Sequence, residues 1–471
     1  MASIAFNKAQ LGREQVRGTS VVADERVNGI FTLTSEKTFD LPVDNRGSLA
    51  EHFRSSTVAQ RGAWTIESSV TYEQLIHWLA MSLKGGVEPA VTTADAAKYS
   101  DNAVFSNLPL AIDDLPGTEE DFVAFVAADD KLLIGKTAGP FRGVKFTMGT
   151  TKNAAASKIT TVEVSDGASG FIAATLVKDK TLNPAGTVWG SRTGVVEFTV
   201  PTGWAADTID TVSAFWVRLT WDVDWTAGVD IEELDYVPID AIWTYTPNLT
   251  AVNVQDSYSI EWGDDDQAWQ SLFCLMESFE LGWGLNAPVT MRSSLFSRFP
   301  SKVTFTSGLS NPQSLTGVAS NDAKVFIDGT YANLGTTQKA TLVVGGVIRL
   351  PATGVTPIKT ADGTQEFSTI IEARRHLEIE LELLLGTDAI TEYDAFVAET
   401  LRAIRIEFTG PSIVSGTTHK LTIDAIGKYT SSPELFGERD GANIFRLTFS
   451  SFEDTLGNEM SFVLQTARAA A

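Results

Sequence analysis

The sequence is poor in cysteine and in basic residues. Its single cysteine, Cys274, excludes an intramolecular disulfide framework, and the apolar neighbours Phe273 and Leu275 predict a buried, unreactive thiol. Lys and Arg together number 36 against 59 Asp and Glu, which gives a formal net charge of −23. A chain with this excess of carboxylates does not present the broad cationic surface that grips a nucleic-acid backbone.

Long apolar runs are also missing. No stretch of about 18 consecutive apolar residues occurs, so the sequence predicts no membrane-spanning helix. The N-terminal segment lacks the apolar centre of a secretory signal peptide. We therefore expect a protein that is made and stays in solution, and its 471 residues are enough for about three domains of ~150 residues.

The residue patterns of common enzymes and metal sites do not occur in the sequence. The four histidines contain no pair four residues apart, so a helical zinc site is not predicted. Residues 134–137 resemble the end of a phosphate-binding loop, but Asp130 stands where the first glycine is required. The acidic stretch 263–266 lacks the alternating ligands of a calcium loop. We expect no enzyme and no cofactor, although folding could still pair two carboxylates as in a glycosidase.

Two stretches that are far apart in the sequence follow one plan, a strand with alternating apolar residues followed by a short helix. The first reads GAWTIESSVTYEQLIHWLAMSLKGG, where Thr71 and Gln74 are spaced as a capping box that starts a helix. The second reads HLEIELELLLGTDAITEYDAFVAETLRAIRIEF, with a strand over 377–385 and a helix over 391–401. Hairpins follow in both cases. The repeated plan indicates an internally duplicated unit, in which each half-buried sheet face needs a neighbour to cover it.

Residues 118–236 have a different residue pattern from the rest of the chain. Short strands and turn signals alternate there, as in an all-β sandwich or jelly roll. We therefore predict a first module over 1–117 that resumes over 237–315, an insertion over 118–236, and a second module over 316–471. The insertion contains a cluster of four tryptophans, which are Trp204, Trp216, Trp221 and Trp225. Exposed rings would stack on sugars, whereas their place in alternating strands favours a core position.

Three glutamates form the one charge pattern that predicts a structural arrangement. Glu378, Glu380 and Glu382 alternate with aliphatic residues, so the three carboxylates should lie in a row on one face of a strand. A solvent-facing sheet surface would show this pattern. So would an acidic inner wall, where like-charged rows keep a polyanion from sticking.

Five stretches outside the insertion carry a family resemblance: LGREQVRGTSVVADERV, TYEQLIHWLAMSLKGG, DAIWTYTPNLTAVNVQDSYSIEWGDD, CLMESFELGWGLNAPVTMRSSLFSRFP and GANIFRLTFSSFEDTLGNEMSFVLQT. Through them the chain resembles the tail tube (major tail) proteins of long-tailed bacteriophages, especially of flexible, non-contractile tails. The insertion, with FTVPTGWAADTIDTVSAFWVRLTW, is similar to jelly-roll, discoidin-like accessory domains of phage structural proteins.

The resemblance implies a mainly β fold with two tandem tail-tube β-sandwich or barrel modules, each with one short helix, plus an inserted β-jelly-roll domain. In the family, each module contributes a four-stranded sheet to a continuous barrel, and a ring holds six modules. Most members carry one module per chain. Two modules per chain imply that three chains complete a pseudo-hexameric ring.

The function implied is that of a structural subunit of a tail tube, found in the virion after assembly in the host cytoplasm. Its acidic lumen, with Glu378, Glu380 and Glu382 as lining candidates, would conduct viral DNA during ejection without specific binding. The implied partners are other copies of the chain, a tape-measure protein, the tail terminator and distal tail proteins, and host surface glycans for the insertion. No membrane partner is expected. The alternative is a carbohydrate-binding adhesin or a glycoside-processing virion protein.

Overall fold

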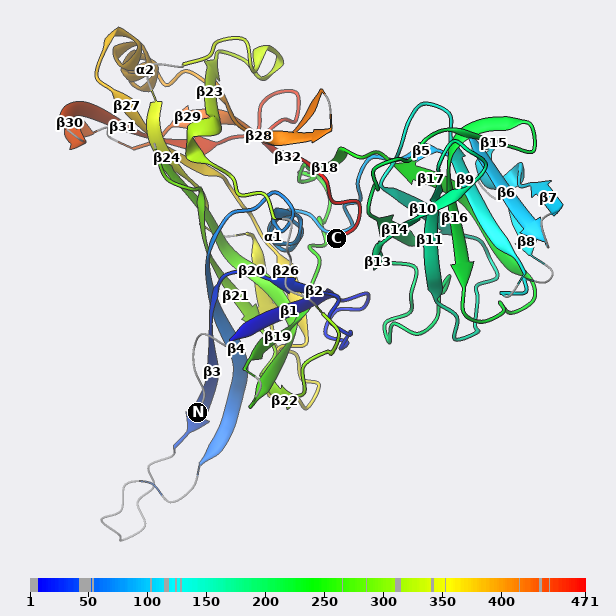
Figure 1. Ribbon diagram of the computed structural model, residues 1–471. Helices are drawn as coiled ribbons and strands as arrows, with labels where there is room; N and C mark the ends of the chain where they lie inside the picture. The colour runs from blue at the N-terminus through cyan, green and yellow to red at the C-terminus, as the bar shows by residue number, and fades with distance from the viewer. Residues whose placement is uncertain are drawn as a thin grey trace. The chain divides into compact units, whose positions relative to one another are not determined.

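Strands dominate the computed structural model of the chain (Figure 1), so the predicted mainly β fold is confirmed. The structure describes residues 7–41, 52, 55–101, 104–113, 118–122, 125–127, 129–264, 266–284, 286–309, 315–339, 343–351, 353–414, 416–431, 434–439 and 441–471. The chain divides into two compact units. Unit 1 comprises Met1–Val87, Thr244–Pro411 and Lys420–Leu464, and unit 2 comprises Glu88–Trp243, Ser412–His419 and Gln465–Ala471.

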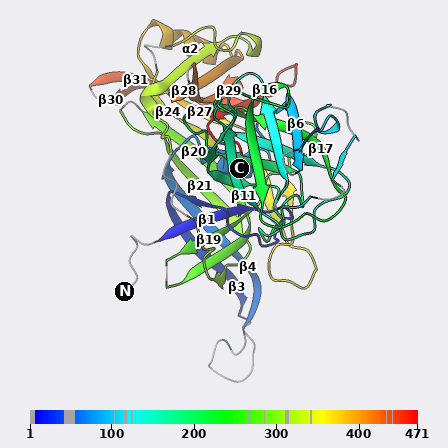
Figure 2. The same ribbon diagram turned by 45° about the vertical axis from the view of Figure 1, so that its right-hand side comes forward.

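Unit 1 is built on one antiparallel path of eight strands. In order of pairing these are β3 (Ile30–Asp40), β4 (Ser56–Ser69), β21 (Thr290–Ser297), β20 (Ala268–Gly284), β24 (Val343–Leu350), β27 (Glu378–Leu384), β31 (Ala442–Ser451) and β30 (Glu434–Arg439). The hairpin of β3 and β4 stays side by side in both ribbon views (Figures 1 and 2).

The first four strands and the last four are connected in the same way. In each half, two paired strands come first in the chain, β3 with β4 and β24 with β27. A later hairpin then adds its second strand to the inner one, as β21 adds to β4 and β31 adds to β27. The halves are joined where β20 pairs with β24, from Phe279 opposite Leu350 to Gly284 opposite Gly345.

Each half has one helix, which follows its second strand. Helix α1 (Leu75–Ser82) is entirely buried, and α2 (Thr387–Val397) buries only Ala389, Glu392 and Ala395. Both predicted helix starts were wrong. The α1 cap is Gln74, with no side-chain capping bond, because the Gln74 amide instead contacts Asn28 and Arg26. Helix α2 begins one turn before Thr391.

The remaining elements of unit 1 flank this sheet. Strands β1 (Lys8–Arg13) and β2 (Glu25–Val27) pair with each other, and β1 also pairs with β19 (Tyr258–Gly263). The others are β18 (Ala241–Tyr245), β22 (Ser301–Val303), β23 (Ala323–Asp328), β25 (Val355–Ile358), β26 (Thr369–Glu372), β28 (Arg402–Val414), β29 (Thr417–Tyr429) and β32 (Met460–Thr466), with the 3₁₀ turns η3 (Ser320–Asp322) and η4 (Tyr331–Asn333). Four of these strands cross the unit bounds, since unit 2 takes 241–243 of β18, 412–414 of β28, 417–419 of β29 and 465–466 of β32. Strand β23 pairs with β28 as β1 does with β19.

Unit 2 is a sandwich of two antiparallel sheets. One contains β13 (Leu176–Asp179), β14 (Gly194–Phe198), β10 (Gly143–Met148), β17 (Val229–Val237), β5 (Thr92–Thr93) and β8 (Glu120–Phe122). The other contains β12 (Phe171–Ala174), β11 (Ile159–Ser165), β16 (Val212–Trp221), β9 (Lys131–Lys136), β6 (Ala96–Asp101), β7 (Val104–Asn107) and β15 (Asp207–Ile209). A 3₁₀ turn, η2, covers Leu110–Ile112. Apolar residues of both sheets, such as Phe146 and Val217, form one core.

The insertion begins earlier than the sequence predicted. Strands β5 and β6 lie in the stretch assigned to the first module, 1–117, but they pair with β17 and β9 of the sandwich. The boundary therefore lies at Glu88 instead of 118. These pairings join strands that are far apart in sequence, and local periodicity carries no signal for them.

Candidate assembly surfaces

The row of glutamates on β27 lies on one face of the sheet, as the alternation predicted. Glu378, Glu380 and Glu382 are half-buried, whereas the aliphatic residues between them are fully buried on the other face. The buried face continues across the path through Ile66, Met291, Leu281, Ile348 and Leu447. One face of the sheet thus packs on the core, and we call the other the polar face.

Arginines relieve the negative charge of the polar face. Arg349 of β24 places Nε 2.8 Å from a carboxylate oxygen of Glu280 and Nη1 2.9 Å from one of Glu380. Burial lowers the pKa of Arg349, but the hydrogen bonds to these two carboxylates outweigh it, and the pKa is raised overall. Arg446 lies 3.1 Å from Glu382. The row of glutamates is therefore part of a charge-paired surface.

The same charge pattern occurs in the first half. Arg292 lies 3.1 Å from Glu67 and stands opposite Glu280. In the second half, Arg446 stands between Glu382 and Glu434 in the same way. The sequence analysis missed this row of alternating Glu and Arg residues across the strands. The arginines belong to strands that are distant in the chain from those of the glutamates. The spacing of Glu and Arg on the two closing hairpins was the available signal.

The path of strands ends in two edges. Strand β3 pairs with β4 on one side and β30 pairs with β31, and the described strands leave the other side of each unpaired. Ile30 at the start of β3 is 68% exposed. An unpaired strand edge carries a row of backbone donors and acceptors that readily pair with another chain.

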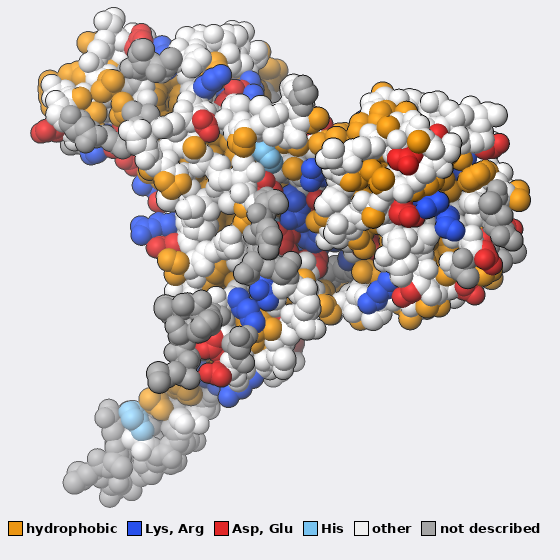
Figure 3. Space-filling model, in the orientation of Figure 1, with side chains coloured by type: hydrophobic (Ala, Val, Ile, Leu, Met, Phe, Trp, Pro, Cys, Tyr) orange, Lys and Arg blue, Asp and Glu red, His pale blue; other side chains and the backbone are white. Residues whose placement is uncertain are grey.

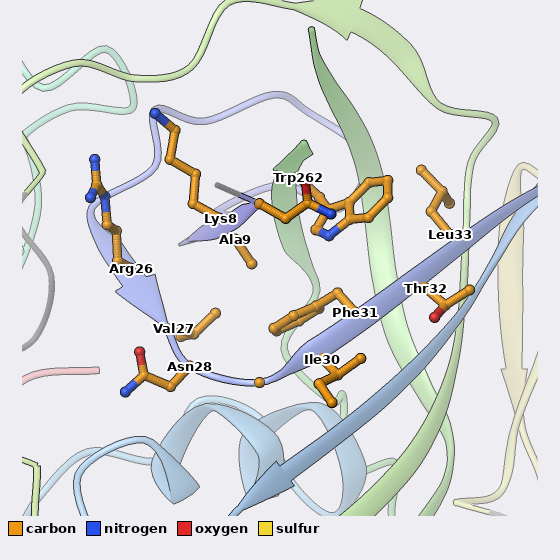
Figure 4. A pocket seen from close by; sticks show the side chains of 12 residues that line it. Lys8, Ala9, Arg26, Val27, Asn28, Ile30, Phe31, Thr32, Leu33 and Trp262 are labelled. Atoms are coloured by element: carbon orange, nitrogen blue, oxygen red, sulfur yellow. The ribbon is translucent and has the colours of Figure 1, made fainter. Parts of the chain in front are cut away.

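A hollow of about 670 Å³ lies beside the edge strand β3 (Figure 4). Its walls come from β1, β2, β3 and β19. The rings of Phe31 and Trp262 lie next to each other along its length, Leu33 lies beyond them, and Lys8 and Arg26 lie towards the other end (Figure 4). The hollow is thus apolar along β3 and cationic at one end. Sequence reasoning did not identify it, because four separate segments build it.

A second apolar surface surrounds α2 and the other edge strand. Hydrophobic side chains gather on the end of unit 1 that carries α2 and β30 (Figure 3). A shallow pocket of about 380 Å³ is lined there by Leu385, Ile390, Tyr393, Phe436 and Phe445. Phe436 of β30 is 76% exposed and Ile390 of α2 is 54% exposed. Exposed apolar area of this kind often marks an interface.

The surface around α1 in the first half is equivalent to the surface around α2. Residues of the second half of the same chain cover it. A Cβ on Gly410 would lie 2.8 Å from the Tyr72 ring, so this glycine lets β28 approach the residues before α1 closely. Arg375 donates a 2.7 Å hydrogen bond to the carbonyl oxygen of Leu83, just after α1. Helix α1 is buried in part because the chain continues over it.

The tryptophan cluster of the insertion belongs to its core. Trp204, Trp216, Trp221 and Trp225 are each at most 7% exposed. Trp225 stacks on Phe125 with ring centroids 3.9 Å apart and on Trp189 at 4.5 Å, two partners that sequence reasoning missed. These four rings therefore offer no exposed platform for a sugar.

The other candidates from the sequence take structural positions. Cys274 is fully buried, as predicted, and burial raises the pKa of its thiol. Ile134 and Gly135 lie inside strand β9 and not in a phosphate-binding loop. His77 is buried between Glu25 and the hydroxyl of Tyr258. Among the residues that the structure describes, no group of three or more His, Cys, Asp and Glu side chains is placed to hold a metal ion.

A scan against models of protein families finds no match, and a search of curated proteins finds no similar sequence. None of the described helices has the length and apolar character needed to cross a membrane.

Proposed function

We propose that the protein is a structural subunit of a phage tail tube that assembles by joining the sheet edges of successive copies. The eight-strand path of unit 1 carries this proposal. It consists of two four-strand halves with the same connections, already joined edge to edge at β20 and β24. The edges left over, β3 and β30, correspond to the two strands that meet at that internal junction.

The correspondence extends to individual residues. Glu67, Arg292 and Glu280 stand opposite one another in the first half, as Glu382, Arg446 and Glu434 do in the second. By this register, Ile30 of β3 corresponds to Gly345 of β24, and Thr34 corresponds to Arg349. The pairing of Glu280 with Arg349 at the junction then predicts that Glu434 of one copy stands opposite Thr34 of the next.

An interface between two different edges is heterologous, and repetition of such an interface gives either a closed ring or an open filament. Closure leaves no unpaired strand, which removes the edges that otherwise promote aggregation. Three copies would supply six halves, the number that the family resemblance implies for one ring. The pseudo-hexameric trimer is therefore our proposed assembly, with stacked rings forming the tube.

The polar face would line the lumen, because the opposite face of the sheet is occupied by the core. Its paired Glu and Arg side chains suit a wall along which DNA slides. A duplex carries one charge per ~1.7 Å of its axis, and an unpaired cationic wall would hold it by counterion release. The tape-measure protein, the tail terminator and distal tail proteins are proposed partners by resemblance alone.

The alternative proposal, a carbohydrate-binding or glycoside-processing protein, loses the observation on which it rested, since the four tryptophans are core residues. No other observation on the described residues favours it.

Sedimentation velocity with negative-stain microscopy tests the assembly directly. We expect trimers, or tubes with a regular axial repeat, when the purified protein is concentrated. A monomer at every concentration, with no tubes in the images, would contradict the proposed function.

A further inference from the structure

The internal junction shows how one aromatic side chain is covered when two edges meet. Trp283 of β20 stands opposite Gly346 of β24. Its ring packs edge-on against Phe408 of β28, with ring centroids 5.9 Å apart, and Trp283 is only 7% exposed. The second half thus receives a side chain from the neighbouring edge, in the space between β24 and β28.

The first half has a corresponding space, which is the hollow beside β3. Trp262 stands opposite Ala9 across β1 and β19, and Phe408 stands opposite Ala323 across β23 and β28. Both aromatic residues end an Ile-Glu-aromatic triplet, at 260–262 and at 406–408. Trp262 therefore corresponds to Phe408. Figure 4 shows the Trp262 ring lining the hollow beside β3.

The wall of the hollow that β3 forms corresponds to β24 at the internal junction. Ile30 stands opposite Glu67 as Gly345 stands opposite Glu382, so Phe31 takes the place of Gly346. The space that holds Trp283 at the internal junction is thus lined by Phe31 and Trp262 at the free edge. Among the described strands, β3 pairs only with β4, so no neighbouring strand brings a counterpart of Trp283 to the hollow.

The edge that would arrive there is β30, which carries one exposed aromatic residue. Glu434 stands opposite Arg446 as Glu280 stands opposite Arg292. The register of β30 shifts before Gly437, so that β30 has one residue more than β20 at this point, and Phe436 lies at the shift. An inserted residue of this kind bends an edge strand and redirects a side chain. Phe436 is 76% exposed.

We propose that the hollow beside β3 is the docking site for Phe436 of a second copy of this chain. The proposal rests on the assembly proposed above and names the contact that would fix its register. Charge agrees with it, because Lys8 and Arg26 line one end of the hollow and the exposed Glu438 follows Phe436 on β30. An apolar side chain seated centrally with a charged rim is the usual anatomy of a specific interface.

The test is self-association of the full chain, measured by sedimentation velocity. Phe436→Ala should weaken it roughly 10- to 100-fold, the change expected for one lost buried aromatic side chain. The matched control is Phe452→Ala, since Phe452 is 46% exposed and lies outside both edges. The control should assemble as the wild type does.

A mixing experiment separates the two sides of the contact. Ile30→Glu places a charge at the hollow, and Phe436→Asp places one on the arriving strand. Each variant alone should stay monomeric, with an unchanged circular dichroism spectrum. An equimolar mixture should form one heterodimer and stop, because each variant keeps one good edge. If Phe436→Ala assembles like the wild type while the wild type forms rings, the docking site is wrong and the proposed function stands. If the wild type never assembles, both fail.

Discussion

Trp283 of β20 packs edge-on against Phe408 of β28, with an interplanar angle of 86°. The two residues lie 125 positions apart and belong to different halves of unit 1. Their contact closes the back of the junction whose polar face is closed by Arg349 and Glu280. The halves of unit 1 therefore behave as one folded body around this junction.

Removal of the indole should destabilise unit 1 strongly. Trp283→Ala leaves a cavity between β20 and β28, and such substitutions cost about 3–5 kcal/mol of unfolding free energy. The control is Trp269→Ala on the same strand, where the side chain is only half-buried. Urea denaturation measures both. Equal losses for the two variants would show that the junction contributes no special stability.

The insertion should be dispensable for assembly, provided that it is removed at its structural boundary. Replacing 88–240 by a short Gly-Ser linker removes β5 and β6 together with their partners, and we expect rings to form as in the wild type. Replacing only 118–236 leaves β5 and β6 in the chain but removes their pairing partners β17 and β9. That variant should aggregate. Loss of assembly in the longer deletion would place the insertion within the tube wall.

His419 should make unit 2 sensitive to acid. Burial, with a contribution from the charge of Arg142, lowers the pKa of His419 to about 4 in the folded state. The unfolded chain binds this proton near pH 6.5, so the free energy of unfolding should fall by up to about 1.4 kcal/mol per pH unit between about 6.5 and 4. Denaturant melts at pH 7.5, 5.5 and 4.5 measure this slope. His419→Gln should flatten it, and an unchanged slope would assign the acid sensitivity to other groups.

The glutamates of β27 should keep DNA from binding to the tube wall. Changing Glu378, Glu380 and Glu382 to Gln removes three negative charges from the polar face, including one carboxylate partner of Arg349 and one of Arg446, so assembled tubes should bind labelled duplex DNA more tightly in low salt. Binding should weaken as salt rises. The logarithm of the binding constant should fall linearly with the logarithm of the salt concentration, with a slope of about −0.9 for each phosphate contact. Fluorescence anisotropy measures it.

The control for this experiment removes the same number of charges from α2 and the residues after it, with Asp388→Asn, Asp394→Asn and Glu399→Gln, where all three carboxylates are exposed. It should not bind. Equal binding by both variants would show that these glutamates do not line the lumen.

Local patterns predicted the faces of the strands correctly. The alternation along β27 identified which residues are buried, and the alternating strands around Trp204 and Trp216 favoured the core positions that these residues occupy. Each of these predictions needs only the period of a strand, which the sequence displays directly.

Partners that come from distant segments were not predictable in this way. Arg349 pairs with Glu280 across 69 positions, and the hollow beside β3 needs β19 as well as the N-terminal strands. The helix starts failed for a related reason. Tertiary contacts from Asn28 and Arg26 hold the Gln74 amide that the capping pattern had assigned to the helix.

Disulfide cross-linking between copies tests the central claim most directly, since the only native cysteine is fully buried. The register of the internal junction predicts that Thr34→Cys and Glu434→Cys, combined in one chain, stand opposite each other in neighbouring copies. Mild oxidation should then give covalent dimers and a closed trimer on a non-reducing gel. Ser35→Cys with Glu434→Cys, shifted by one residue to the other face of β3, should cross-link poorly. Efficient cross-linking of the shifted pair, or none by either pair in assembled protein, would contradict edge-to-edge assembly in this register.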